Sequence, residues 1–159
     1  PCGVSYLWPS SRDWRAANAV MVAGSVVVLI LGFPSRRLLE QQVERDNPVA
    51  AVAYLRRARL AGPMLNYYEW GGYLIWALPE QKVFIDGRGD IFDWTGVLSA
   101  YGRWMQLLED PRKLPDRYGV RYCLLPKGAP VSVVLPLLPG WQQVYADERA
   151  VIVARSEPR

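Results

Sequence analysis

The stretch that decides the fold is YYEWGGYLIW at residues 67–76, followed after five residues by KVFIDGRGD at residues 82–90. It combines an aromatic cluster, a glycine pair and an apolar run that ends in a charged loop containing glycine. The run 82–86 is β-branched and aromatic and lies between Pro79 and Gly87, which predicts a buried strand. The glycine pair at 71 and 72 predicts the start of one or two helical turns after a short strand over 64–67.

The chain after this stretch continues the alternation of helices and strands. Apolar spacing predicts helices over 93–108, 114–118 and 129–138, with Pro136 ending or kinking the last of them. A second buried strand is expected over 120–125, and two alternating runs at 141–146 and 150–154 predict a terminal hairpin. The expected fold class is therefore α/β: a small three-layer domain over residues 63–156, with a mostly parallel sheet and a C-terminal antiparallel hairpin.

The chain before this stretch contains a long apolar run. Residues 16–35 carry no charge, and a helix of about 18 residues rises roughly 27 Å, close to the thickness of a bilayer core. We therefore expect a loop over 1–15 and a transmembrane helix over 16–35. The alternatives are a cleaved signal peptide, although Phe33 to Arg37 does not resemble a small-residue cleavage site, and a buried core helix, although only Asn18 and Ser25 interrupt the apolar surface.

Residues 36–62 are expected to form a connector and an amphipathic helix. Asn47 and Pro48 predict the start of that helix, with Asn47 as the N-cap, and Gly62 and Pro63 follow its end. Its outer face is basic, with arginines at 56, 57 and 59. These arginines contact lipid or phosphate in one interpretation and form a solvated face in the other.

Composition excludes several classes of function. The chain of 159 residues has no histidine, which removes the Ser-His-Asp and Cys-His constellations and nearly every catalytic zinc site. The formal charge of +4 comes from basic residues spread among acidic ones, so no nucleic-acid partner is expected. Two cysteines are too few for a disulfide framework. Because the chain begins with Pro1, we expect a fragment or a processed form.

Candidate binding residues follow the predicted strands. Ligands of open α/β sheets gather at the carboxyl ends of parallel strands, and Glu69, Asp86, Asp90 and Lys127 each follow such an end. Aromatic faces beside these groups suit a sugar or a peptide. In the alternative interpretation, the carboxylates only form turns and internal ion pairs, and the aromatic side chains only pack. The substrate-binding candidates are Glu69, Trp70, Tyr73, Asp86, Arg88 and Asp90; no catalytic residue and no metal ligand is expected in this segment.

Residues 67–71, Tyr-Tyr-Glu-Trp-Gly, are similar in type and order to the Trp-Trp-Asp-Tyr-Gly motif of oligosaccharyltransferase catalytic subunits. The chain from its apolar helix to its hairpin resembles the C-terminal, extracytoplasmic part of polytopic glycosyltransferases that use polyprenyl-phosphate sugars, including bacterial family 39-type enzymes. Val83 to Asp86 occupies the place of the strand that follows the motif. Four of the five motif letters differ, so peptide-hydroxyl recognition does not carry over.

The resemblance implies a non-catalytic role, in acceptor recognition or structural support, because the catalytic acids of such enzymes lie in earlier membrane loops. It implies the lipid bilayer and the upstream membrane region as partners, with a glycan or peptide acceptor and a polyprenyl-phosphate sugar. No cofactor is expected within this segment, and a divalent cation belongs to the full-length protein. The soluble domain would lie outside the cytoplasm at the cell membrane, although Arg36, Arg37 and Arg45 mildly favour the cytoplasm. The alternative function is a membrane-anchored structural or interaction domain without a ligand of its own.

Overall fold

The computed structural model describes residues 11–156, and the chain divides into two compact units, Pro1–Gln42 and Val43–Arg159. The first unit contains helix α1, Ser11–Gly32. This helix begins at Ser11, so residues 11–15 are helical and not the loop that we predicted; residues 1–10 of that loop lie outside the described part. Arginine and alanine have high helix propensity, and Arg12, Arg15, Ala16 and Ala17 lie in this part of the chain.

Within the described residues, α1 is the one helix long and apolar enough to cross a membrane, over Trp14–Gly32. Taken by itself, it exposes its apolar side chains. A signal sequence near an N-terminus and the core helix of a soluble protein can pass the same test of length and composition. Helix α2, Arg36–Asp46, follows and continues into the second unit, which confirms a helical connector.

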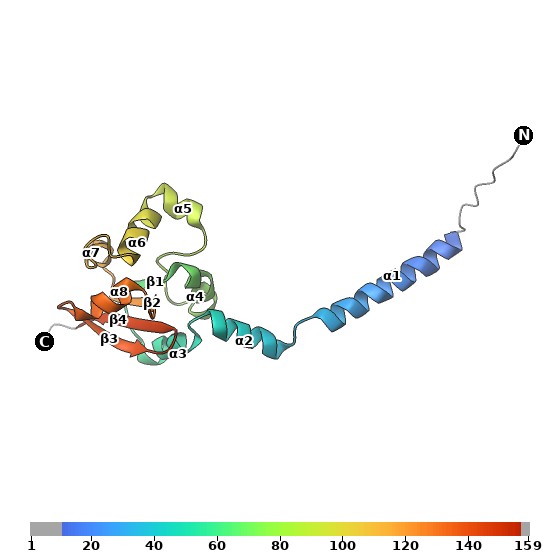
Figure 1. Cartoon of the computed structure of the whole chain (residues 1–159), viewed down its shortest axis with the longest axis horizontal. Helices are drawn as coiled ribbons and strands as arrows, with labels where there is room; N and C mark the ends of the chain where they lie inside the picture. Colours follow the sequence, from blue (N-terminus) through green and yellow to red (C-terminus); the bar gives the residue numbers. More distant parts are fainter. Residues whose placement is uncertain (1–10, 157–159) are drawn as a thin grey trace, which may run out of the picture. The chain divides into compact units, whose positions relative to one another are not determined.

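The second unit is a mixed α/β domain (Figure 1). Its remaining elements are α3 (Val49–Ala58), β1 (Met64–Asn66), the 3₁₀ helix η1 (Tyr68–Trp70), α4 (Gly71–Ala77), α5 (Gly89–Trp94), α6 (Val97–Met105), α7 (Lys113–Arg117), β2 (Tyr122–Pro126), α8 (Pro130–Val134), the 3₁₀ helix η2 (Leu135–Leu137), β3 (Trp141–Ala146) and β4 (Ala150–Arg155). The start of α3 differs in detail from the prediction, because Pro48 is the N-cap and Asn47 donates its side-chain amide to Val43.

The sheet has four strands in the order β1-β2-β4-β3. Only β1 and β2 are parallel; β4 is antiparallel to both β2 and β3. The prediction of a mostly parallel sheet is therefore wrong. The physical reason lies in β4, where all five residues from Ala150 to Ala154 are buried, so that this strand pairs on both sides and occupies an interior position in the sheet.

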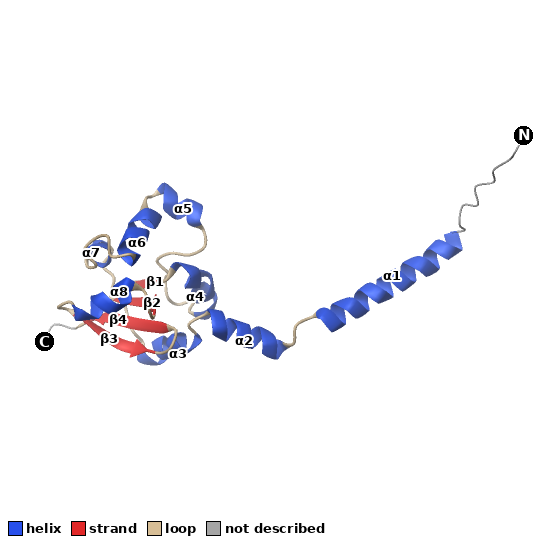
Figure 2. Cartoon of the chain, viewed as in Figure 1, coloured by secondary structure: helices blue, strands red, loops and turns tan. Residues whose placement is uncertain are grey.

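The helices and strands of the domain are distinguished by colour in Figure 2. Its buried apolar side chains form two hydrophobic clusters. Side chains alternate along β2, so that Tyr122 and Leu124 join one cluster whereas Cys123 and Leu125 join the other. The first cluster contains residues of α3 and α4, and the second contains residues of α6, α7 and α8. Each cluster thus joins side chains of the sheet to side chains of helices, and the burial of these apolar groups stabilises the domain.

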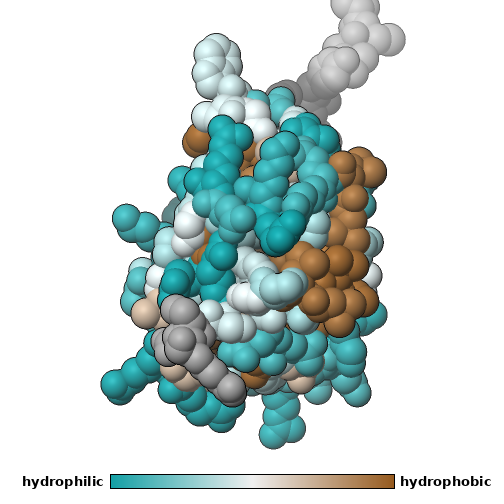
Figure 3. All heavy atoms as spheres, turned by 90° about the vertical axis from the view of Figure 1, so that its left-hand side faces the viewer, coloured by the Kyte–Doolittle hydropathy of each residue, from teal (hydrophilic) through white to brown (hydrophobic). Residues whose placement is uncertain are grey.

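The surface of the domain is mixed in character. Figure 3 shows a largely polar face with an apolar area at its right-hand side. The exposed large apolar side chains of the second unit include Ile75, Trp76, Ile91, Trp94, Val133 and Leu137.

The segment 82–86 is not a strand, which corrects our clearest strand prediction. It runs beside β1 without a backbone ladder because the fully buried side chain of Asn66 takes the place of a neighbouring strand. Asn66 Oδ1 accepts from the backbone N–H of Phe84 at 2.8 Å, and Nδ2 donates to the Ile85 carbonyl at 2.8 Å. Nδ2 also donates to the Tyr67 carbonyl at 2.9 Å. One side chain thus satisfies backbone groups on both segments.

The predicted helix over 93–108 is two helices, α5 and α6. Gly96 separates them with a left-handed φ of 70°, a conformation that interrupts a right-handed helix and suits glycine. The predicted kink at Pro136 is confirmed as a change from α8 to the 3₁₀ helix η2. The terminal hairpin is confirmed as β3 and β4, with a register shift between Gln143 and Tyr145.

Helix α4 starts in close contact with the segment 82–86. A Cβ atom on Gly71 would lie 2.4 Å from the Ile85 carbonyl oxygen and 2.6 Å from the Asp86 Cα atom. A Cβ atom on Gly72 would meet nothing within 4 Å. Gly71 therefore permits the approach of the two backbones, whereas Gly72 does not take part in it.

We expect Gly71→Ala to lower the free energy of unfolding by about 1–3 kcal/mol, because the added methyl group must displace backbone atoms. Gly72→Ala is the matched control and should be neutral or slightly stabilising, since alanine favours a helix. Urea denaturation of the full chain in detergent, followed by tryptophan fluorescence, measures both. Equal stability of the two variants would contradict the close approach.

Candidate functional site

Asp86, the last residue of the segment 82–86, and Arg88 form a bidentate ion pair. Arg88 Nε donates to Asp86 Oδ1 at 2.8 Å, and Nη2 donates to Oδ2 at 2.6 Å. The Arg88 backbone N–H also donates to Oδ1, at 3.0 Å. These hydrogen bonds from Arg88 lower the pKa of Asp86, against the opposing effect of its burial. The carboxylate is 2% exposed, and its acceptor capacity is directed at Arg88.

Asp90 lies two residues beyond this pair, in the first turn of α5, and is exposed. The neighbouring Gly89 faces Tyr68, whose hydroxyl would lie 3.2 Å from a Cβ atom at that position. Asp86, Arg88 and Asp90 thus form one charged loop beside η1.

The aromatic candidates are largely packed. Trp70 is 5% exposed and belongs to the first hydrophobic cluster, where its ring meets Tyr67 edge to face at 5.2 Å. Tyr73 is half-buried on α4, and its ring centroid lies 6.0 Å from that of Trp76. Burial raises the pKa of Tyr73, and Arg56 opposes this effect. Trp70 therefore packs inside the domain, whereas Tyr73 keeps part of its surface exposed.

An open groove of ≈ 550 Å³ lies at the carboxyl ends of the parallel strands β1 and β2, and we name it the carboxyl-edge groove. It brings Glu69 and Trp70 together with Lys127, as expected for groups that follow neighbouring parallel strands. Its walls are Asp46, Tyr67, Glu69, Trp70, Pro126, Lys127, Glu148 and Arg149. Tyr73, Asp86, Arg88 and Asp90 are not among them.

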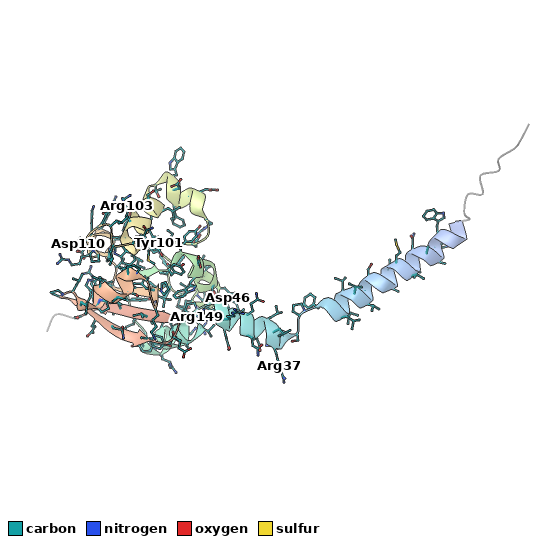
Figure 4. The ribbon with its side chains drawn as sticks, viewed as in Figure 1. Arg37, Asp46, Tyr101, Arg103, Asp110 and Arg149 are labelled. Carbon is teal, nitrogen blue, oxygen red and sulfur yellow. The ribbon has the colours of Figure 1, made fainter. Side chains whose placement is uncertain are left out.

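The sequence predictions did not include the walls from α2 and the hairpin turn. Asp46 ends α2, and Glu148 and Arg149 lie in the turn between β3 and β4; Asp46 and Arg149 are labelled in Figure 4. β4 begins opposite the end of β2, with Ala150 paired to Pro126, so this turn arrives at the carboxyl edge. The sequence signal for these residues was the continuous apolar run 150–154, which indicates an interior strand and hence a hairpin turn at this edge.

The hairpin turn is held in place by its own hydrogen bonds. Asp147 Oδ1 accepts from the backbone N–H groups of Arg149 and Ala150, each at 2.7 Å, and Oδ2 accepts from the Tyr145 hydroxyl at 2.7 Å. The Lys127 backbone N–H donates to the Arg149 carbonyl at 2.8 Å. The backbone positions of Lys127 and Arg149 are therefore fixed by hydrogen bonds.

A second open groove of ≈ 610 Å³ adjoins the first at the hairpin turn. Both grooves share Glu148 and Arg149, and the second extends to Glu44 and to the start of α3.

Tyr67 in the carboxyl-edge groove is protonated at neutral pH. Burial is the main cause that raises the pKa of Tyr67, and the nearby Glu69 carboxylate raises it further.

The carboxyl-edge groove combines carboxylate acceptors, ammonium and guanidinium donors, and a phenol. Hydroxyl groups both donate and accept hydrogen bonds, so this mixture suits a polyhydroxylated ligand. Among the residues that the structure describes, no three His, Cys, Asp or Glu side chains are grouped so as to hold a metal ion.

Comparisons of the chain with protein-family models, with curated proteins and with solved structures find no significant match. Functional inference therefore depends on the geometry of the domain and on its sequence motifs.

We expect Asp86→Asn to destabilise the protein at neutral pH, and the difference from wild type to shrink as the pH falls. A carboxyl whose pKa is lowered by folding stabilises the protein above its unfolded pKa of about 3.9, and this stabilisation is lost as pH falls through the lower, folded pKa. Urea denaturation at pH 7 and at several values below pH 4 measures the difference. The exposed Asp90→Asn is the control; an equal and pH-independent effect of both variants would contradict the ion pair.

Proposed function

We propose that this chain is the non-catalytic C-terminal portion of a membrane glycosyltransferase-like protein that uses lipid-linked sugar donors. In this proposal the carboxyl-edge groove binds the hydroxylated acceptor. The observation that supports it most directly is that Glu69, Trp70 and Lys127 line one open groove at the ends of two parallel strands.

The chemistry of the groove supports binding to a sugar. Carboxylates such as Glu69 can accept hydrogen bonds from sugar hydroxyls, and Lys127 and Arg149 can donate to their oxygens. Pro126 and Tyr67 add apolar surface for the C–H face of a sugar ring, and the largely buried Trp70 lies beside them. The groove is open to solvent, which suits the end of a longer glycan or peptide.

Helix α1 supports the membrane part of the proposal. Its length and apolar composition are those of a membrane anchor, with the bilayer and the upstream membrane region of the same protein as partners. We propose an extracytoplasmic domain.

A cysteine introduced at the exposed Glu148, in a chain that also carries Cys2→Ser, should react with a membrane-impermeant reagent in intact cells. Protection until lysis would place the domain in the cytoplasm. Cys123 itself is buried and is unsuitable.

We also propose that the domain has three layers. A three-layer domain, with helices on both sides of a central sheet, is supported by the two hydrophobic clusters that receive alternate side chains of β2 and β4.

A second candidate function is a membrane-anchored structural or interaction domain without a ligand. Two observations favour it: the Asp86 carboxylate is fully engaged by Arg88, and Trp70 packs inward. In that case the carboxylates after the strands only stabilise the domain.

The two candidates differ in the effect of Glu69→Gln and Lys127→Gln on sugar transfer by the full-length protein in membranes. If the groove binds the acceptor, each variant should reduce transfer from polyprenyl-phosphate sugars by about tenfold or more, since a hydrogen bond to a charged group contributes roughly 1.5–3 kcal/mol. Urea denaturation should be unchanged. Asp93→Asn, an exposed acid outside the groove, is the matched control.

Unchanged transfer in both groove variants would leave the structural domain as the better account. Asp86→Asn separates the candidates further, because a structural ion pair predicts lower stability with little effect on transfer at temperatures where the variant remains folded.

A further inference from the structure

A separate pocket of ≈ 250 Å³ lies at the opposite end of β2, and we name it the amino-edge pocket. Tyr122, the first residue of β2, forms one wall, and the last turn of α3 and the residues after α4 form the others. It shares no residue with the carboxyl-edge groove, where Pro126 marks the other end of the same strand.

Tyr122 lines this pocket, and its buried hydroxyl lacks a partner. Tyr122 is 1% exposed, and its hydroxyl oxygen is the one buried side-chain oxygen or nitrogen without a hydrogen bond among the described residues. A buried polar group without a partner is costly and calls for an explanation. Burial is the main cause that raises the pKa of Tyr122 to about 12, and the nearby Glu80 adds to it. The hydroxyl therefore stays protonated and can donate a hydrogen bond to an acceptor.

Two arginines line the same pocket. Arg56 donates from Nη2 to the Ala77 carbonyl, which fixes its guanidinium beside α4 and leaves its other N–H groups available. Arg59 forms no ion pair within residues 11–156, and its backbone adopts a left-handed φ of 49° at the C-cap of α3. Glycine would relax that conformation, yet the position carries a long cationic side chain.

The charge of the walls limits the ligand. Arg56 and Arg59 bring two positive charges and Glu80 brings one negative charge, so the walls carry a net charge of +1 (two minus one). A net positive lining favours an anion over a neutral or cationic ligand. Leu55, Leu60 and Leu78 add apolar walls, which suit an anion that carries organic substituents.

We infer that the amino-edge pocket binds a monoanionic phosphate diester, with Arg56 and Arg59 on its non-bridging oxygens and the Tyr122 hydroxyl as a third donor. A phosphate diester carries a single negative charge and several acceptor oxygens, and guanidinium groups match phosphate oxygens well. The diester can come from a phospholipid headgroup or from a soluble molecule. This inference does not depend on the proposed acceptor groove.

The test uses the full chain in neutral detergent and two probes: soluble glycerophosphoglycerol, and phosphatidylglycerol added to the micelles. Phosphorus NMR titrations measure the dissociation constant of each. We expect binding to be weakened about tenfold by Tyr122→Phe and by Arg59→Gln, because each removes a hydrogen bond to a charged group. Arg57→Gln is the matched control on the same helix, outside the pocket, and should change binding less than twofold.

Binding of the soluble probe would identify a diffusible ligand, and binding of the micellar probe alone would identify a lipid headgroup; both support the inference. Failure of both probes to bind would overturn it. So would an equal loss with Arg57→Gln, which would indicate attraction to the overall positive charge. Glu69→Gln should leave these titrations unchanged, so failure of the acceptor groove and failure of this pocket are distinguishable.

Thermal unfolding gives an independent measure. Without a phosphate diester, Tyr122→Phe should be at least as stable as wild type, because the hydroxyl has no partner to lose. With saturating ligand, wild type should gain more stability than the variant. An equal gain in both proteins would overturn the role of the hydroxyl.

Discussion

The hydrogen bonds of the Asn66 side chain are the interaction on which the rest of the domain depends. It lies at the end of β1, fully buried, and hydrogen-bonds to the backbone of Tyr67, Phe84 and Ile85. A buried backbone segment needs partners for its N–H and C=O groups, and one amide side chain supplies them here. The segment 82–86 therefore lies beside the sheet without forming a fifth strand. Asp86 at its end is paired with Arg88.

This arrangement separates two regions that the sequence pattern brings together. The loop after the segment 82–86 closes on itself through the Asp86–Arg88 ion pair. The carboxyl edge of the true parallel pair instead receives Glu69 and Lys127, and the hairpin turn completes its groove. The amino edge of β2 has a different chemistry, with a phenol and two arginines in one pocket. The two ends of a single central strand thus offer one site suited to hydroxyl groups and another suited to an anion.

Local patterns predicted the elements whose stability is local. The hairpin, the turns after Gly71 and the change at Pro136 each depend on nearby turn residues and alternation, and all are present. The apolar run 82–86 was misassigned because periodicity cannot tell a ladder from a segment satisfied by a distant side chain, here Asn66. The break at Gly96 was missed because an isolated glycine is compatible with a helix until its φ is known. The position of β4 depends on long-range pairing, which also explains why Arg149 was absent from the predicted site.

The most direct test of this account is amide hydrogen exchange at Phe84 in the wild-type chain and in Asn66→Leu, which keeps the size of the side chain and removes its hydrogen bonds. The account predicts slow exchange at Phe84 in wild type and fast exchange in the variant, while the amide of Leu124 in β2 stays protected in both. Equal protection of Phe84 in the two proteins would contradict it, and would mean that packing alone holds the segment 82–86 against the sheet.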